Sequence, residues 1–416
     1  MEEFAKSVLV VGFNTRPLTY SLKKAGYVVY AVDFFGDLDF YPNVKDSFVL
    51  TKELGTDYNT IKDKYSKLLA KYAIKMLKKY PEIEYLIIGS GLDDAYEERK
   101  TILNEILQKN YRIKDLSNDL ETIKNARNIE QVYDYLKFNK FNVPFSIALE
   151  KLKFYKHQIQ FPIIFKKFKS AGGINVFKIK NLENLFSLIE ELRSKNSNLS
   201  GWLIQEYIDG IPISCTTISN GKECWVVSIN RQIIGEPLLN PPKEFTYCGN
   251  IVPTRLSKND DKLIAKISIF LTNKLGLKGI NGFDYVLRDH YPYLMEINPR
   301  IPGSIRASEE SFDLNLLDLH IKSFDLNQWE SVKKSIKSTK SKGFTTKLIF
   351  FAPKEIDKNL IIKINNLEYI HDKSESNRKI LKGEPLCTVL YKAHNLSESY
   401  NGAQRIVNEI NTIIDS

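Results

Sequence analysis

A short polar stretch in the second half of the chain has the residue types of a divalent-cation site. The stretch GFDYVLRDHYPYLMEINPRIPGS (282–304) contains Asp284, Glu296, Asn298 and Arg300. The runs VLR and YLMEI predict two strands joined by a short loop at Asp289 to Tyr291, which places Asp284 opposite Glu296. Because side chains alternate between the two faces of a strand, Glu296, Asn298 and Arg300 point the same way. Two facing carboxylates repel unless a cation neutralises them, and magnesium prefers oxygen ligands.

The composition indicates a globular protein with two or three domains. The chain has 416 residues, and 43% of them are hydrophobic. No apolar run approaches the length of a membrane helix, and the N-terminus lacks the apolar region of a secretory signal. The four cysteines form no CxxC pair, and the five histidines show no metal-type spacing. We therefore expect a cytoplasmic protein with no membrane partner, no zinc site and no disulfide framework.

The basic net charge allows two interpretations. A net charge of +10 and an isoelectric point near 9.0 are compatible with a nucleic-acid partner. However, the lysines are spread among 50 acidic residues along the whole chain. The densest basic stretch, SVKKSIKSTKSKGFTTK (331–347), has the composition of a solvated linker. We expect no nucleic-acid partner, and a basic surface that attracts an anionic nucleotide.

Strands and helices alternate in the first hundred residues, which predicts a parallel sheet. The expected strands are 7–13, 27–33 and 83–94, and the expected helices are 15–26 and 60–80. Ligands bind at the carboxyl ends of the strands in such sheets. A nicotinamide dinucleotide is not favoured, because GFNTRP (12–17) retains only the first glycine of GxGxxG.

The rest of the chain mixes helices with antiparallel strands. The sequence predicts helices at 125–146, 259–276 and 399–415, and strands at 347–353 and 383–393. A hairpin is expected at 213–229, because Asn220-Gly221 is a strong turn signal.

Two segments carry residues that could bind a nucleotide. FPIIFKKFKSAGGINVFKI (161–179) places Lys166 before Gly172 and Gly173, so a lysine and exposed backbone amides could bind phosphate. The alternative is a strand followed by an ordinary glycine turn. WLIQEYIDGIP (202–212) could offer an exposed strand edge to adenine and an acid to ribose hydroxyls. The alternative there is a plain amphipathic strand and turn.

Taken in this order, these segments resemble the ATP-grasp superfamily. The similarity is to its predicted ATP-dependent carboligases, which are related to biotin carboxylase and the large chain of carbamoyl-phosphate synthetase. It rests on PIIFK with GG (162–173), IQEYIDG (204–210), GFDYV (282–286) and MEINPRIPGS (295–304). The resemblance implies an α/β fold, α+β in the ATP-grasp part. Its expected domains are a parallel-sheet domain (1–112), a two-subdomain ATP-grasp domain (113–330, lid about 147–208), a lysine-rich linker (331–345) and a small C-terminal domain (346–416).

The resemblance also implies roles for individual residues. Asp284, Glu296 and Asn298 would hold Mg²⁺, or Mn²⁺, on the phosphates of ATP. Arg300 and Asn298 would be catalytic, with Arg300 steadying an acyl phosphate. The nucleotide would contact Lys166, Gly172, Gly173, Gln205, Glu206, Ile208, Asp209 and Arg127. Arg127 stands near the position of a frequent family lysine, and Lys124 is a competing candidate for that role. The hinge pair Gln205-Glu206 departs from the more frequent Glu-Lys.

The implied activity is an ATP- and magnesium-dependent carboxylate–amine ligase that releases ADP and phosphate. The alternatives are a bicarbonate-dependent carboxylase or carbamoyl-transfer enzyme, and a non-catalytic ATP-binding protein. The expected partners are a small-molecule carboxylate and an amine, and the protein could form a homodimer. The acceptor site is expected to include Asn14, Ser90, Tyr247, Gly249 and Ser304.

Overall fold

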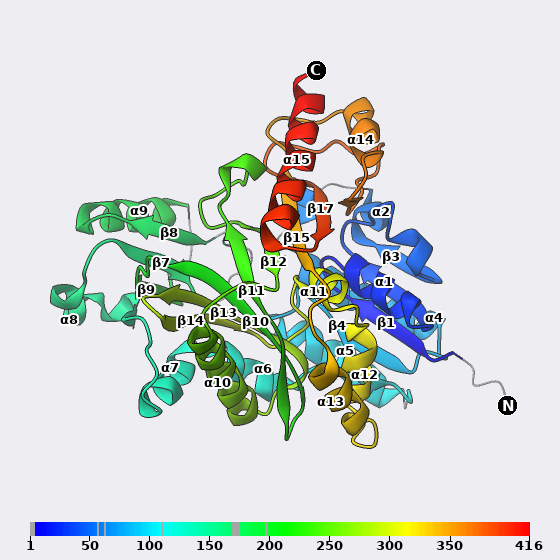
Figure 1. Ribbon diagram of the computed structural model, residues 1–416, viewed down its shortest axis with the longest axis horizontal. Coiled ribbons are helices and arrows are strands. Elements are labelled where there is room, and N and C mark those ends of the chain that lie inside the picture. Colours follow the sequence, from blue (N-terminus) through cyan, green and yellow to red (C-terminus); the bar gives the residue numbers. More distant parts are fainter. Residues whose placement is uncertain are drawn as a thin grey trace.

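The computed structural model describes residues 5–55, 58–61, 64–109, 111–168, 173, 175–195 and 199–416 (Figure 1). Strands within these residues form three sheets, of five, eight and four strands. Gly172, one of the predicted nucleotide contacts, lies outside the described residues. Within the part of the chain described here, no helix has the length and apolar character needed to span a bilayer.

The N-terminal sheet is parallel, as the alternating pattern predicted. Its strands run in the order β3-β2-β1-β4-β5. They are β1 (Ser7–Val11), β2 (Val28–Asp33), β3 (Asp46–Val49), β4 (Tyr85–Ile88) and β5 (Lys114–Asp115). The accompanying helices are α1 (Arg16–Lys24), α2 (Leu50–Leu54), α3 (Tyr58–Ile61), α4 (Tyr65–Lys79) and α5 (Tyr96–Gln108), with a short 3₁₀ turn at Tyr41–Asn43.

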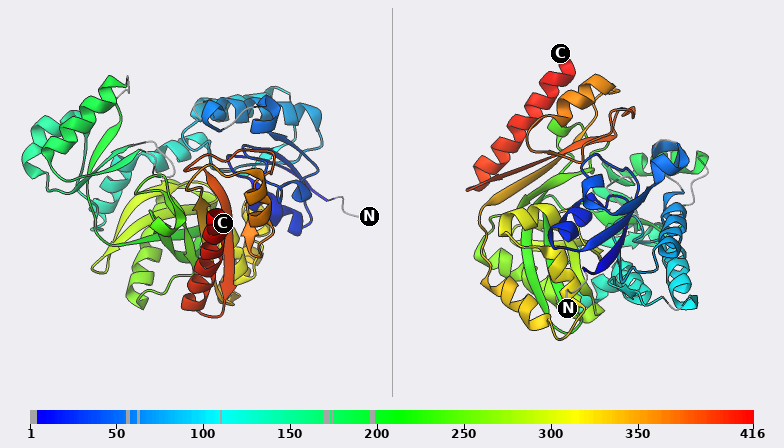
Figure 2. Two further views of the ribbon diagram at one scale, coloured as in Figure 1. Left: turned by 90° about the horizontal axis from the view of Figure 1, so that it is seen from above. Right: turned by 90° about the vertical axis from the view of Figure 1, so that its right-hand side faces the viewer.

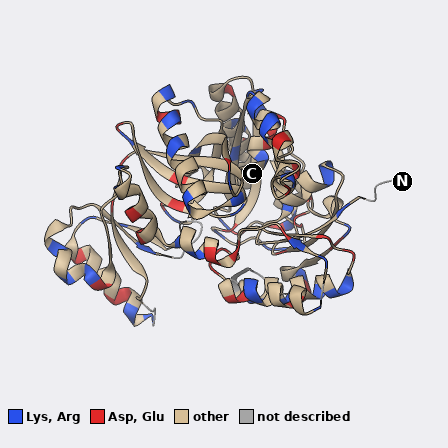
Figure 3. Cartoon of the chain, turned by 90° about the horizontal axis from the view of Figure 1, so that it is seen from below, with Lys and Arg blue, Asp and Glu red and all other residues tan. Residues whose placement is uncertain are grey.

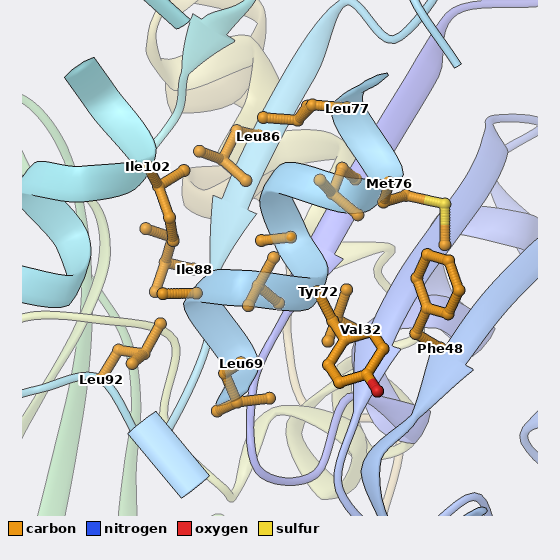
Figure 4. Close-up of a cluster of buried hydrophobic side chains, with 14 of the residues drawn as sticks. Val32, Phe48, Leu69, Tyr72, Met76, Leu77, Leu86, Ile88, Leu92 and Ile102 are labelled. Atoms are coloured by element: carbon orange, nitrogen blue, oxygen red, sulfur yellow. The ribbon is translucent and has the colours of Figure 1, made fainter. Parts of the chain in front are cut away.

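Apolar side chains fix helix α4 against one face of this sheet. Leu69, Tyr72, Met76 and Leu77 of α4 lie against Val32 and Phe48 on one side and Leu86 and Ile88 on the other (Figure 4). Their spacing is that of one helical face. This packing holds the carboxyl ends of β1, β2 and β4 in place, and those ends point toward the rest of the molecule.

The central sheet has eight strands in the order β14-β13-β10-β11-β12-β15-β17-β16. They are β10 (Ile211–Asn220), β11 (Cys224–Ile234), β12 (Tyr247–Val252), β13 (Lys278–Arg288), β14 (Tyr291–Asn298), β15 (Phe344–Phe351), β16 (Ile370–His371) and β17 (Pro385–Ala393). The C-terminal strands therefore extend this sheet through the pairing of β12 with β15. The predicted domain boundaries stay a prediction.

The third sheet, β6-β9-β7-β8, projects from the rest of the molecule (Figure 2). Its strands are β6 (Ser146–Ala148), β7 (Ile163–Lys167), β8 (Val176–Ile179) and β9 (Trp202–Glu206), and it carries α8 (Leu152–Tyr155), α9 (Leu182–Ser194) and 3₁₀ turns at Leu149–Lys151 and Lys156–Gln158. We call this four-stranded sheet and its helices the lid. Its core includes the stacked rings of Phe165 and Trp202, 4.6 Å apart. The lid thus has a core of its own.

The remaining helices cover the central sheet. They are α6 (Leu120–Arg127), α7 (Ile129–Phe138), α10 (Lys258–Leu275), α11 (Ile305–Phe312), α12 (Leu316–Ser323), α13 (Trp329–Ser338), α14 (Lys358–Asn365) and α15 (Leu396–Asp415), with a 3₁₀ turn at Pro237–Leu239. Helix α13 overlaps the stretch expected to be a linker, which is a correction. It is helical because Trp329 and Val332 are buried one turn apart while its lysines stay on the solvent side. Basic residues, in blue, and acidic residues, in red, are both distributed over many elements of the chain (Figure 3).

Candidate active site

The predicted two-stranded hairpin is formed by β13 and β14. Asp284 lies opposite Glu296, and Gly282 lies opposite Asn298, as the spacing predicted. The connecting turn contains Asp289 and His290, with φ angles of 50° and 66°. Two successive positive φ angles are typical of a tight type I′ hairpin turn. The turn is one residue shorter than expected, because β14 already begins at Tyr291.

Two carboxylates and two amides converge at this hairpin. The Asn298 amide donates to Asp284 Oδ2 at 2.8 Å, and the Gln232 amide donates to Asp284 Oδ1 at 2.9 Å. Burial and the neighbouring Glu296 carboxylate raise the pKa of Asp284 to about 7, although both amides and the charge of Arg300 oppose that shift. A carboxylate with this raised pKa has insufficient positive charge around it.

The donor set fits a hard divalent cation. Asp284, Glu296 and Asn298 each offer at least one side-chain oxygen, which is the ligand type that Mg²⁺ prefers. Within the described ranges, no group of three or more His, Cys, Asp or Glu side chains has an arrangement suited to a metal. In the hairpin, the third ligand oxygen would come from the side-chain amide of Asn298. Gln232 was not predicted, because its place beside Asp284 depends on the order of strands in the sheet.

Arg127 supplies positive charge to the hairpin from the last residue of α6. Its Nη1 forms an ion pair with Glu296, and its Nη2 and Nε donate to Asp94 at 2.8 and 3.1 Å. Its side chain is only 5% exposed. Lys124 is exposed, and its ammonium lies 5.3 Å from the centre of the Tyr96 ring. Of the two candidates, the structure brings Arg127 to the hairpin.

Arg300 is held by the same loop of the N-terminal domain. Its Nε donates to Asp93, and its Nη2 lies 3.4 Å from Asn298 Oδ1. Burial alone would raise the pKa of Asp93. Nearby guanidinium groups hold that pKa below its usual value instead; they belong to Arg300, Arg127 and Arg99.

Asp93 and Asp94 are therefore the attachment points of both arginines. They follow β4 at the carboxyl end of the parallel sheet. The sequence analysis named the neighbouring Ser90 for the acceptor site but missed the role of these two acids. Two adjacent acids at a strand end were the available signal.

Lys166 reaches toward this cluster from β7 of the lid. Burial lowers the pKa of its ammonium to about 8, the Arg127 guanidinium lowers it further, and the Glu296 carboxylate opposes the shift. Gly173 has a φ of 76°, and a Cβ atom there would lie 2.6 Å from the carbonyl carbon of Phe245. Only glycine fits this close approach.

The hinge segment differs from the sequence-based expectation. Strand β9 lies between β6 and β7, so it offers no exposed edge to adenine. The Gln205 amide donates to the Tyr133 hydroxyl at 2.9 Å and to Ser146 Oγ at 3.0 Å, which turns it into the core.

The segment after Gln205 changes from buried to exposed within a few residues. Glu206 pairs with Arg288 at 3.3 Å, Ile208 is buried, and Asp209 is exposed. The edge prediction failed because strand order depends on pairing partners far along the chain.

The five predicted acceptor residues have different partners in the structure. Asn14 Nδ2 donates to Asp372 at 3.4 Å, and the Ser90 carbonyl accepts a bond from the Phe13 amide at 2.8 Å. The Tyr247 hydroxyl bonds Asn250.

The remaining two residues lie at the start of α11 and within β12. Ser304 immediately precedes α11. Gly249 pairs with Leu348, and its Cβ would lie 2.8 Å from the carbonyl carbon of Lys347. Steric fit alone accounts for glycine at residue 249.

Comparison with protein families finds a match for the middle of the chain. The family model described as an ATP-grasp domain matches residues 127–304, which include the hairpin, the lid and Arg127. Residues 127–304 are an ATP-grasp domain. An uncharacterized protein of Methanocaldococcus jannaschii is 27% identical over 389 residues, covering 92% of this chain and 88% of that protein.

Solved ATP-grasp structures share the fold across nearly the whole chain. An L-amino acid ligase from Bacillus licheniformis matches with a TM-score of 0.70 and 17% identity, covering 98% of both chains. The biotin carboxylase domain of a Hydrogenobacter thermophilus 2-oxoglutarate carboxylase matches with a TM-score of 0.70 and 12% identity, covering 96% of this chain and 89% of that one. That domain was solved with MgADP and bicarbonate. ATP-grasp homologues bind ATP or ADP with Mg²⁺.

Proposed function

We propose that this chain is an ATP- and magnesium-dependent ligase that activates a small-molecule carboxylate as an acyl phosphate and joins it to an amine, releasing ADP and phosphate. The observation that carries the proposal is the hairpin, where Asp284, Glu296 and Asn298 face one another. Arg127 and Arg300 supply positive charge beside it.

The chemistry requires activation because a free carboxylate is a poor acylating agent. Its leaving group would be oxide, whereas ATP supplies a phosphoryl group that leaves as phosphate. The oxygen ligands of Asp284, Glu296 and Asn298 would hold Mg²⁺ on the nucleotide phosphates. The protein then acts mainly by positioning groups and neutralising charge.

The cationic side chains would bind different parts of the reacting groups. Arg127 pairs with Glu296, and the charge of Lys166 is felt by the same carboxylate, so both cations would bind phosphate oxygens beside it. Arg300 would stabilise the charge of the acyl phosphate, and its planar guanidinium can contact two oxygens at once. Asp93 and Asp94 hold the two arginines in place.

The test is to incubate the protein with ATP, MgCl₂, hydroxylamine and pools of carboxylic acids, and to measure ADP and hydroxamate together. We expect hydroxamate from one pool, loss of both products in Glu296→Gln, and wild-type amounts in Glu355→Gln, which changes an exposed acid paired with Lys379. ADP formation that depends on bicarbonate alone would replace the ligase by a carboxylase. ATP binding without ADP from any pool would refute the enzyme proposal.

A further inference from the structure

Three segments from different parts of the chain meet beside the active site. They are the loop after β2, the turn at Asp372 between β16 and β17, and the N-terminus of α11. Hydrogen bonds from the Leu38 amide to the Lys373 carbonyl, at 2.7 Å, and from the Lys373 amide to Asp39, at 2.9 Å, join the first two. The junction of these three segments contains a buried acid and buried hydrogen-bond donors, and neither has a partner among the residues that the structure describes.

On one side lies a buried carboxylate without a counterion. Asp37 is 9% exposed, and its carboxylate has no hydrogen-bond or ion-pair partner in the described part of the chain. Arg16 is nearby, but it already forms ion pairs with Asp372 and Asp39. Burial and the charges of Asp372, Asp33 and Asp39 raise the pKa of Asp37 well above its usual value, although Arg16 opposes this. A carboxylate in this position would be stabilised by one additional cation.

An organic ammonium fits this position better than a metal ion. The described residues contain no group of three or more His, Cys, Asp or Glu side chains arranged for a metal. Asp33 is also engaged, because it accepts bonds from the amides of Thr15, Phe35 and Gly36 at 2.7, 2.9 and 2.8 Å. An ammonium group has three N–H donors and can satisfy a carboxylate without a shell of several charged ligands.

On the other side lie donors without acceptors, at the N-terminus of α11. Ser304 is 3% exposed, and its Oγ has no partner among the described residues. The backbone amides of Arg306 and Ala307, both in buried residues, also have no acceptor in the part of the chain that is described. A buried helix N-terminus needs acceptors for its first amides, and a carboxylate supplies two oxygens.

Lys347 connects the two sides of the junction. It is 7% exposed, and its Nζ donates to the Gly303 carbonyl at 3.0 Å, directly before Ser304. The same ammonium attracts the Asp372 carboxylate. A series of contacts through Lys347 and Asp372 therefore links the donors at Ser304 to the surroundings of Asp37.

We propose that this junction binds an amino acid, with its ammonium group beside Asp37 and its carboxylate at Ser304 and the N-terminus of α11. This rests on the proposed function and narrows it, since it makes an amino acid one of the two substrates. A substrate with only one charge would leave one of the two unpaired sets buried without a partner.

The test measures thermal stabilisation of the full chain by three matched probe pools. They are the proteinogenic amino acids, the amines left when each loses its carboxylate, and the acids left when each loses its amine. We expect the amino-acid pool to raise Tm by several degrees and each of the other pools to raise it by less than a third as much, because a ligand stabilises by its affinity for the folded state.

Two variants and one control locate the effect. Asp37→Asn and Ser304→Ala should each reduce the stabilisation at least threefold, whereas Asp313→Asn, a change at an exposed acid paired with Lys342, should not. Without ligand, Asp37→Asn should be at least as stable as wild type, because it removes a buried carboxylate that has no partner. If Asp37→Asn fails to fold, Asp37→Ser takes its place. The proposal is overturned if the amino-acid pool stabilises both variants as much as it stabilises wild type. It is also overturned if NaCl alone raises the Tm of wild type and Asp37→Asn abolishes that increase.

The test of the amino-acid site and the test of the ligase activity can fail independently of each other. Hydroxamate formation without any stabilisation by the amino-acid pool would overturn this inference and leave the ligase standing. Stabilisation by amino acids that both variants lose, without ADP from any acid pool, would support the site and refute the ligase.

Discussion

Replacing Gly249 by alanine provides a sharp test of how the C-terminal strands join the central sheet. Gly249 has a φ of 139°, and a Cβ there would lie 2.8 Å from the Lys347 carbonyl carbon and 3.2 Å from Leu348 Cα. All of these neighbours are backbone atoms of β15, so no side chain can move to make room. The two strands must separate near the Gly249–Leu348 and Asn250–Lys347 pairs.

The expected loss of stability follows from two contributions. Weakening about two backbone hydrogen bonds removes roughly 2 kcal/mol, and an alanine at positive φ adds about 1–2 kcal/mol. The free energy of unfolding should therefore fall by about 3–4 kcal/mol. Gly276→Ala is the matched control, because Gly276 has a φ of 68° at the end of α10 and no atom lies within 4 Å of its Cβ position. It should lose only the backbone contribution, about 1–2 kcal/mol.

Urea unfolding followed by circular dichroism measures both variants. The reasoning fails if the two free energies of unfolding agree within about 0.5 kcal/mol. The reasoning also fails if Gly249→Ala is as stable as wild type but forms no ADP. That result would support the substrate contact predicted for Gly249 from the sequence.

Three further results are expected at the active site. Glu296→Gln should reduce Mg²⁺-dependent ADP formation at least about a hundredfold, and MgATP titration calorimetry should show weaker binding; unchanged Mg²⁺ dependence would contradict the assigned ligand. Asp93→Asn should lower kcat by about tenfold, or about 1.4 kcal/mol, while the Kd for MgATP stays constant, because it weakens the hydrogen bond to Arg300 whereas Arg127 keeps its bonds to Asp94; an equal change in kcat and Kd would argue against separate roles for the two arginines. The pKa of Lys166 is lowered to about 8, so its positive charge is present below that pH and lost above it. The affinity for MgATP should therefore fall between pH 7.5 and about 9.5, and Lys166→Arg, which stays charged, should flatten that profile; the same slope in both proteins would exclude Lys166 as the cause.

Local sequence patterns predicted the centre of the site because its geometry is local. The hairpin of Asp284 and Glu296 is encoded by alternating side chains and a turn between adjacent strands, so its register follows from spacing. The parallel sheet was predictable for the same reason, since strand and helix alternate along the chain.

Contacts between distant segments were not predictable in this way. Gln232 reaches Asp284 only because β11, β10 and β13 lie in that order, and Asp93, which follows β4 of the parallel sheet, reaches Arg300, which follows β14 of the central sheet. The lysine-rich composition of residues 331–347 concealed a helix whose buried face consists of Trp329 and Val332. Composition averages over a segment, whereas a helical face depends on which positions carry the apolar residues.

The pairing of β12 with β15 also limits where the polypeptide could be cut. A fragment that stops before Phe344 would leave the backbone N–H and C=O groups of residues 249–252 in β12 without their neighbour on that edge. An unpaired, largely buried strand of this kind recruits other chains, so such a fragment should precipitate. Supplying residues 344–416 as a separate peptide during refolding offers the missing strand in trans and should keep the fragment in solution.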